Sequence, residues 1–164
     1  MNQPNDTLVC FAIEELRFAI PINEIKTIIR SVAITPVSGA WHLIHGMINF
    51  RGKVIPVVTL RPRFNLPEKE INIHQQFIIV GKAAKRLALI VDTVEELIAP
   101  DALKVSTVEL PHTGSQQQNI HDYGIDTMQF VSDEKGIIVI YDIQKLIGAE
   151  GILEIESFIN RKTD

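Results

Sequence analysis

Short apolar runs separated by turn residues recur along the whole chain. They lie at residues 8–13, 17–20, 25–29, 47–50, 54–60, 77–80, 87–91, 128–131 and 137–141. Runs of this length at this spacing predict a mainly β protein of short strands. Most connectors, such as 14–16, 51–53 and 81–86, are too short for a crossover helix, so the pattern favours antiparallel hairpins.

The segment 46–61 has too few polar positions for a strand with one face in water. Val54, Ile55, Val57 and Val58 place apolar groups on both sides of one strand, whereas a half-exposed strand alternates apolar and polar residues. Both faces must therefore be covered. Two small barrels packed at a shared seam satisfy this requirement, and a single larger barrel is the competing geometry. Pro56 cannot donate to a ladder and marks an edge or a bulge.

Helix is predicted only near the C-terminus and should cap the barrels. Asp142 is a plausible N-cap and Gly148 a plausible C-terminal glycine for a short helix between them. A second helix is predicted at 150–164, with an apolar stripe that should dock on a sheet. The stripe consists of Ile152, Leu153, Ile155, Phe158 and Ile159. The polar, glutamine-rich segment 112–122 predicts a loop.

The 164 residues are enough for one domain, or for two small lobes that share a core. Cys10 is the single cysteine and lies in an apolar run, which favours a buried thiol over a reactive one. No apolar run approaches the ~20 residues of a membrane span, and the polar N-terminus does not look like a signal peptide. We therefore expect a cytoplasmic protein without direct membrane insertion.

Motifs that carry chemistry are absent from the sequence. It contains no nucleophile elbow, phosphate-binding loop, dinucleotide fingerprint or paired-cysteine zinc pattern. His42 and His45 could share a face, but two imidazoles without a further ligand make an incomplete metal site, and His74, His112 and His121 lie in polar stretches. We expect neither an enzyme nor a metal or cofactor. An enzyme or small-ligand carrier in a groove between lobes is supported only by these scattered histidines.

The net charge of −4 disfavours general phosphate binding. One local exception is a cluster of cations with no acid among them: Arg51, Lys53, Arg61 and Arg63. This cluster keeps open a small-barrel nucleic-acid-binding protein, although only Phe50 and Phe64 lie close enough to stack on bases. A solvated strand edge would produce the same cluster, so we do not expect a nucleic-acid partner.

Arg51 and Gly52 are the positions that stand out on physical grounds. Gly52 can take a positive φ in a tight connection, which leaves the Arg51 guanidinium at the turn. The guanidinium can then make a forked contact to a partner's carboxylate or carbonyls. The alternative is an arginine that only caps its own loop.

Several of these segments, in this order and spacing, resemble the CheW family of chemotaxis coupling proteins over about residues 7–149. The resemblance rests on segments 17–29, 34–37, 45–64, 87–98 and 136–147. In 45–64, a glycine, two apolar residues, Asn, an apolar residue, Arg and Gly precede a strand that contains proline, as in the family. The family usually has Glu where this chain has Thr27, a change that removes a charge.

The resemblance implies one CheW-like domain over 1–164, made of two intertwined five-stranded SH3-like barrels with short helices and a C-terminal helix. It also implies a non-catalytic adaptor. Its partners would be the cytoplasmic tip of a methyl-accepting chemoreceptor, in the groove between the lobes, and the regulatory domain of the histidine kinase CheA, at the barrel ends. The expected partner-binding positions are Ile25, Thr27, Gly46, Asn49, Arg51, Gly52, Val91 and Asp92.

Overall fold

The computed structural model describes residues 7–39, 41–82, 85–99, 104–109 and 127–162. One sheet contains β1 (Leu8–Ile13), β2 (Leu16–Pro21), β8 (Thr93–Ile98), β9 (Ser106–Glu109), β10 (Thr127–Asp133) and β11 (Gly136–Ile140). The other contains β3 (Ile25–Arg30), β4 (Ile44–Phe50), β5 (Lys53–Thr59), β6 (Gln76–Val80) and β7 (Leu87–Val91). The helical elements are η2 (Ile22–Glu24), η3 (Pro62–Phe64), α2 (Ile143–Ile147) and α3 (Ala149–Lys162). The segment 112–122, with His112 and His121, and residues 163–164 lie outside the described part.

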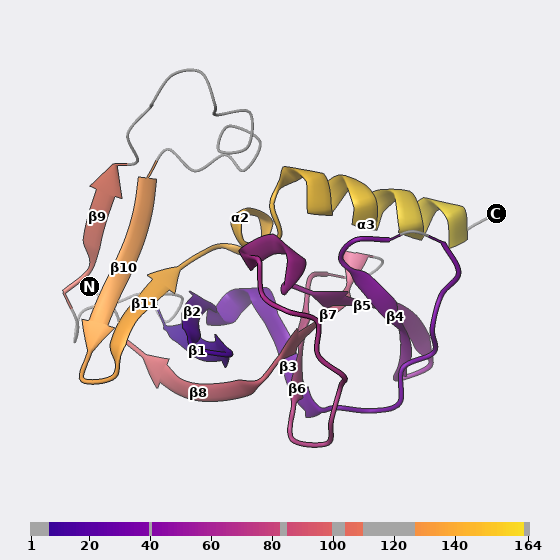
Figure 1. Cartoon of the computed structure of the whole chain (residues 1–164), viewed down its shortest axis with the longest axis horizontal. Coiled ribbons are helices and arrows are strands. Elements are labelled where there is room, and N and C mark those ends of the chain that lie inside the picture. Colours follow the sequence, from indigo (N-terminus) through magenta and orange to yellow (C-terminus); the bar gives the residue numbers. More distant parts are fainter. Residues whose placement is uncertain (1–6, 40, 83–84, 100–103, 110–126, 163–164) are drawn as a thin grey trace.

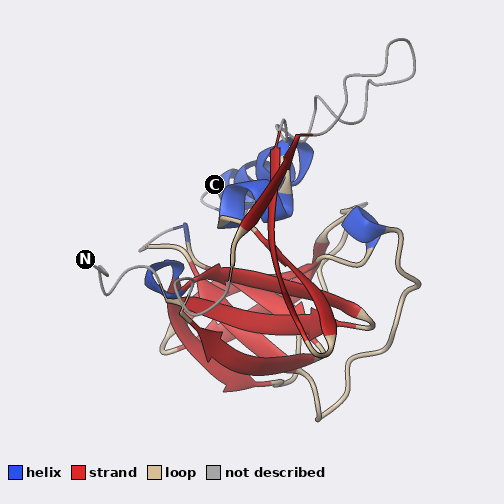
Figure 2. Cartoon of the chain, turned by 90° about the vertical axis from the view of Figure 1, so that its left-hand side faces the viewer, coloured by secondary structure: helices blue, strands red, loops and turns tan. Residues whose placement is uncertain are grey.

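The prediction of a mainly β protein with two lobes is confirmed (Figures 1 and 2). The six-stranded lobe has the strand order β8-β1-β2-β11-β10-β9, and the five-stranded lobe has the order β3-β6-β7-β5-β4. The lobes are interleaved in sequence, because the chain leaves the six-stranded lobe after β2, builds the whole five-stranded lobe, and returns with β8. Where five strands were expected in each lobe, β9 adds a sixth to one of them.

Two strands and two pairings were not predicted from the sequence. β8 carries Glu95 and Glu96, and β9 is a four-residue edge strand, so neither has the apolar run that marks the other strands. The short connectors predicted antiparallel hairpins, but β2 also pairs parallel to β11, and β5 pairs parallel to β7. These two long-range pairings join the hairpins of each lobe.

The two-sided burial of β5 is confirmed, with one exception. Val57 lies in the interior of the five-stranded lobe, whereas Val58 faces a larger cluster that takes residues from both sheets and from α2 and α3. That larger cluster is the seam between the lobes. Val54 is 47% exposed, so the two-sided burial begins at Ile55. Pro56 lies opposite Met47 of β4, one residue before pairing with β7 starts at Val57, which confirms a local edge.

The two C-terminal helices are present. The Asp142 carboxylate accepts a hydrogen bond from Lys145 N at 2.7 Å, as expected of an N-cap, and Gly148 follows α2 with a φ of 83°. Helix α3 packs Ile155 and Phe158 into the seam and lies along the five-stranded lobe (Figure 1). Leu153 was expected in this stripe, but it is 67% exposed because the docked face is narrower than the apolar set. The Glu154 carboxylate reaches the β4 side, where it accepts from Leu43 N at 2.8 Å.

A buried arginine closes the six-stranded lobe at one end. The Arg17 guanidinium in β2 donates to both carboxylate oxygens of Asp133, at 2.6 and 2.7 Å, and to Glu95 of β8 at 2.8–3.3 Å. The hydrogen bonds from Arg17 lower the pKa of Asp133 to about 2. Arg17 thus links its own strand, β2, to β8 and β10, through residues that lie 78 and 116 positions away in sequence.

Cys10 is buried in the interior of the six-stranded lobe, as expected. Burial, with a contribution from the Glu95 carboxylate, raises the pKa of this thiol to about 11. We therefore expect native protein at pH 8 to react with a disulfide reagent such as DTNB at least about 100-fold more slowly than protein in 6 M guanidinium chloride. Equal rates would place the thiol at the surface.

Within the described residues, no helix is both long and apolar enough to cross a membrane.

Candidate functional site

The β4–β5 hairpin carries the arginine and glycine that the sequence singled out. Arg51 and Gly52 both have positive φ, 51° and 79°, which is the backbone of a two-residue turn that matches the twist of the flanking strands. The Asn49 side chain fixes this turn by accepting from Gly52 N at 2.9 Å. The positive φ of Arg51 itself was not predicted. Its guanidinium lies 5.1 Å from the centroid of the Phe50 ring and is exposed at the tip.

Gly46 is a packing position inside the lobe. A side chain there would meet the side chain of Ile34 and the carbonyl of Thr35 at distances that no Cβ tolerates. The close approach exists because Thr35 and Met47 exchange two backbone hydrogen bonds of 2.8 Å across the outer edge of β4. Gly46 therefore shapes the hairpin's base.

Ile25 begins β3 at the same end of the five-stranded lobe as the hairpin tip. Ile25 pairs with Val80 at the end of β6, and Val80 pairs with Leu87 at the start of β7. Since β5 runs parallel to β7, its start at Lys53 and the preceding turn lie at this end too. The register thus places Ile25, Arg51 and Gly52 at one end of the lobe, with Thr27 on the outermost strand beside it.

A hollow of about 610 Å³ opens beside Ile25. Its walls come from η2 and β3, from the β6–β7 turn and from the start of α2, which follows the last strand of the six-stranded lobe. The lining residues are Asn23, Glu24, Ile25, Lys26, Gly81, Lys82, Arg86, Ile143 and Gln144. Glu24 joins two of the walls, because its carboxylate accepts from Ile143 N at 2.9 Å. Burial raises the pKa of Glu24, although that hydrogen bond opposes the shift.

Val91 and Asp92 lie at the opposite end of the five-stranded lobe. Val91 is fully buried in the seam, so it has no surface to offer a partner. Asp92 stands where the chain crosses from β7 back to β8, and its carboxylate accepts from Glu14 N at 2.6 Å and from Gln75 Nε2 at 2.9 Å. Burial alone would raise the pKa of Asp92, but these hydrogen bonds and the charge of Arg61 outweigh it and hold the pKa below its ordinary value.

Arg61 supplies the positive charge beside Asp92, where the chain passes from β7 to β8. Its guanidinium donates to both oxygens of Asp92 at 3.1 Å and to Glu14, in the β1–β2 turn, at 2.7 Å. The side chain is only 7% exposed. Arg61 follows β5 of one lobe and Glu14 belongs to the other, so we call Glu14, Arg61 and Asp92 the inter-lobe clasp.

The four cations between residues 51 and 63 do not form one exposed basic cluster. Arg61 is buried in the clasp, and Arg63 donates to the carbonyls of Leu146 and Lys145 at 3.1 Å, which ties η3 to α2. Only Arg51 and Lys53 of that cluster are exposed residues. A contiguous basic face of the kind that nucleic acid needs is not formed by these residues.

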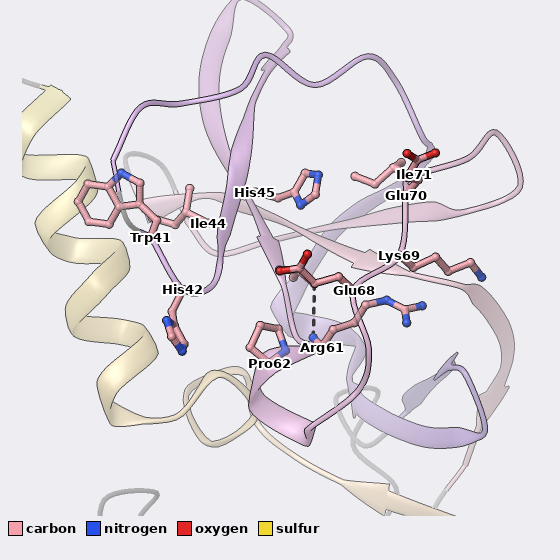
Figure 3. A pocket seen from close by; sticks show the side chains of 11 residues that line it. Trp41, His42, Ile44, His45, Arg61, Pro62, Glu68, Lys69, Glu70 and Ile71 are labelled. Atoms are coloured by element: carbon pink, nitrogen blue, oxygen red, sulfur yellow. Dashed lines mark hydrogen bonds between the residues drawn. The ribbon is translucent and has the colours of Figure 1, made fainter.

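His42 and His45 line a second hollow of about 460 Å³ with Trp41, Arg61, Glu68 and Glu70 (Figure 3). In Figure 3 the two imidazoles do not point toward one another. Among the residues that the structure describes, no group of three or more His, Cys, Asp or Glu side chains is arranged to hold a metal ion.

The chain is similar to proteins of bacterial chemotaxis along almost its whole length. A family model described as the CheW-like domain matches residues 7–151. The chemotaxis protein CheW of Bacillus subtilis is 30% identical over 145 residues, which cover 88% of each chain. CheW of Thermotoga maritima is 27% identical over 85% of this chain and 86% of that protein, and CheW of Treponema pallidum is 24% identical over 94% and 89%.

The fold is also found in a solved structure. The crystal structure of the scaffolding protein TtCheW from Thermoanaerobacter tengcongensis superposes with a TM-score of 0.64, covering 87% of this chain and 92% of that one at 24% identity. The family model, the relative from Bacillus subtilis and the shared fold agree with the resemblance seen in the glycine, asparagine and arginine pattern of β4. The chain belongs to the CheW-like domain family.

Proposed function

We propose that this protein is a non-catalytic adaptor that couples the cytoplasmic tips of methyl-accepting chemoreceptors to the histidine kinase CheA. The observation that carries the proposal is the match to the CheW-like family over residues 7–151, with 30% identity to a chemotaxis protein over 88% of the chain. The adaptor would work in the cytoplasm and be recruited to receptor arrays. No bond is made or broken in this role.

The proposed mechanism is positional. The seam and the inter-lobe clasp hold the two lobes as one body, so two surfaces on it keep a receptor and a kinase at a fixed separation. A change in the receptor tips then shifts the population of kinase arrangements, because the adaptor contacts some of these arrangements more favourably than others. Each interface is expected to bury less than about 1,200 Å². Many weak contacts in an array, rather than one tight contact, would then keep the assembly together.

We assign receptor contact to the end of the five-stranded lobe where the hairpin tip and the hollow beside Ile25 lie. Ile25, Thr27, Asn49 and Arg51 would face the receptor there, and the Gly52 turn would present them. The other expected site residues would act indirectly. Gly46 lets the edge of β4 pack closely, and Val91 and Asp92 fix the crossing between lobes.

Arg51→Ala should weaken binding to a soluble receptor cytoplasmic fragment by about tenfold, because exposed arginines often dominate small interfaces. The variant should melt within about 4 °C of wild type. It keeps a Cβ at the same positive φ and loses only an exposed contact with Phe50, worth roughly 0.5–1 kcal/mol. Titration calorimetry and receptor-dependent kinase activation measure the effect.

Lys53→Ala is the matched control for this experiment. It removes another exposed cation from the same hairpin, outside the turn. Receptor binding by this variant should remain within about twofold of wild type. Unchanged binding by Arg51→Ala would exclude the hairpin tip from the receptor interface, and loss of folding by it would assign Arg51 a structural role.

A further inference from the structure

The hollow beside Ile25 has an unusual charge for this acidic chain. Three cationic side chains, Lys26, Lys82 and Arg86, line it against one carboxylate, that of Glu24. The chain as a whole has a net charge of −4. A local excess of positive charge in such a protein creates a field that attracts an anionic group.

The single carboxylate in the hollow is already engaged. Glu24 Oε2 accepts from the backbone of Ile143 at 2.9 Å, which holds the start of α2 against η2. Among the described residues, none of the three cations has a carboxylate within ion-pair distance. Their charges are therefore not neutralised by the described part of the chain.

Arg86 is the one cation of the hollow that is partly buried. Its Nε is buried and has no hydrogen-bond partner among the described residues. Leaving a buried donor of a charged group unsatisfied is costly, and nearly all such donors in folded proteins are paired. Arg86 also lines the hollow, so its positive charge acts on an anion there, although the covered Nε itself lies out of an anion's reach.

The hollow is also apolar on part of its wall. Ile25 and Ile143 line it beside the cations, so an occupant would present an apolar side chain next to an anionic one. A helix can present an apolar and an anionic side chain next to each other on one face, because residues three or four positions apart are neighbours there. A free phosphate or a nucleic acid would use the cations but not the isoleucines.

We propose that this hollow binds an acidic side chain of the receptor tip, seated by Lys26, Lys82 and Arg86, with a neighbouring apolar side chain of the same helix against Ile25. The proposal rests on the proposed function and adds the chemistry of the receptor segment. The attraction should weaken with salt.

The test is calorimetric titration of Lys26→Glu/Lys82→Glu with a soluble receptor cytoplasmic fragment from the same organism. The double variant should bind at least about tenfold more weakly at 50 mM NaCl, because two attractive charges become repulsive. Wild-type binding should itself weaken several-fold between 50 and 300 mM NaCl. Both residues are exposed, so the variant should fold, and circular dichroism checks this. Substituting lysine for the tip's acidic residues, one at a time, should restore binding to the double variant at one position.

Lys135→Glu is the control, because it reverses one lysine charge on an exposed turn of the other lobe and should bind like wild type. Equal binding by wild type and the double variant, with Arg51→Ala still defective, would overturn the charged hollow and leave the adaptor function standing. If the wild type does not bind the fragment at all, the proposed function itself fails. Binding that weakens in the double variant but is rescued by no receptor substitution would also overturn the proposed pairing.

Discussion

Val57→Asp should destabilise the protein by about 5 kcal/mol and abolish a cooperative native state at 37 °C. Val57 is 0% exposed and packs in the interior of the five-stranded lobe. Removing the valine loses about 1.5–3 kcal/mol of apolar burial, and the carboxylate must either remain charged without a partner or bind a proton. Urea denaturation followed by circular dichroism measures the loss.

Val54→Asp is the matched control for that experiment. It lies on the same strand three residues earlier and is 47% exposed, so the same substitution should change the free energy of unfolding by less than about 1 kcal/mol. A cooperative transition for Val57→Asp near the wild-type midpoint would refute the burial of β5 on both faces. The pair of variants thus tests the two-sided strand on which the two-lobe architecture depends.

Arg61→Leu should cost about 3 kcal/mol at pH 7, because it leaves Glu14 without its cation and Asp92 with only the more distant Lys69, at 4.0 Å. The effect should depend on pH. The pKa of Asp92 is held below its ordinary value in the folded wild type, so its contribution is present above about pH 4 and is lost as the pH falls through the lowered pKa. Urea midpoints at pH 7 and pH 3 should therefore differ less for the variant than for wild type.

Arg61→Lys separates charge from geometry in the clasp. A lysine keeps the positive charge but cannot reach Asp92 and Glu14 together with a planar fork. An intermediate loss is expected. Wild-type stability in Arg61→Leu would mean that the clasp does not hold the lobes, and the seam alone would then have to fix their separation.

The sequence predicted most strands because their burial and their spacing are local properties. The runs at 8–13 and 87–91 coincide with β1 and β7, which are buried along their whole length. β8 and β9 were missed since their charged or exposed residues resemble connectors. Leu153 was misplaced for a related reason: helical spacing shows which residues are apolar, but the width of the docking surface is set by the partner sheet.

Long-range ion pairs could not be predicted from the sequence. Arg61 follows an apolar strand beside other cations, and nothing nearby in sequence indicates that Glu14 and Asp92 surround it, 47 and 31 residues away. Arg17 gave a weak signal, because it interrupts an apolar strand and a buried arginine needs carboxylates. The hairpin site was predictable since its turn is local, whereas the hollow with Lys82 and Arg86 forms only after three separate segments of the chain meet.

The interleaved path of the chain has a consequence for synthesis on the ribosome. Residues 25–91 contain every strand of the five-stranded lobe, so that lobe can assemble as soon as they have emerged. β1 and β2 are made before the five-stranded lobe, yet they wait for β8 and β11 to complete their sheet. The apolar strand β1 must therefore remain unpaired on its β8 side until residues 93–98 have emerged, and an apolar strand edge exposed during this time favours aggregation.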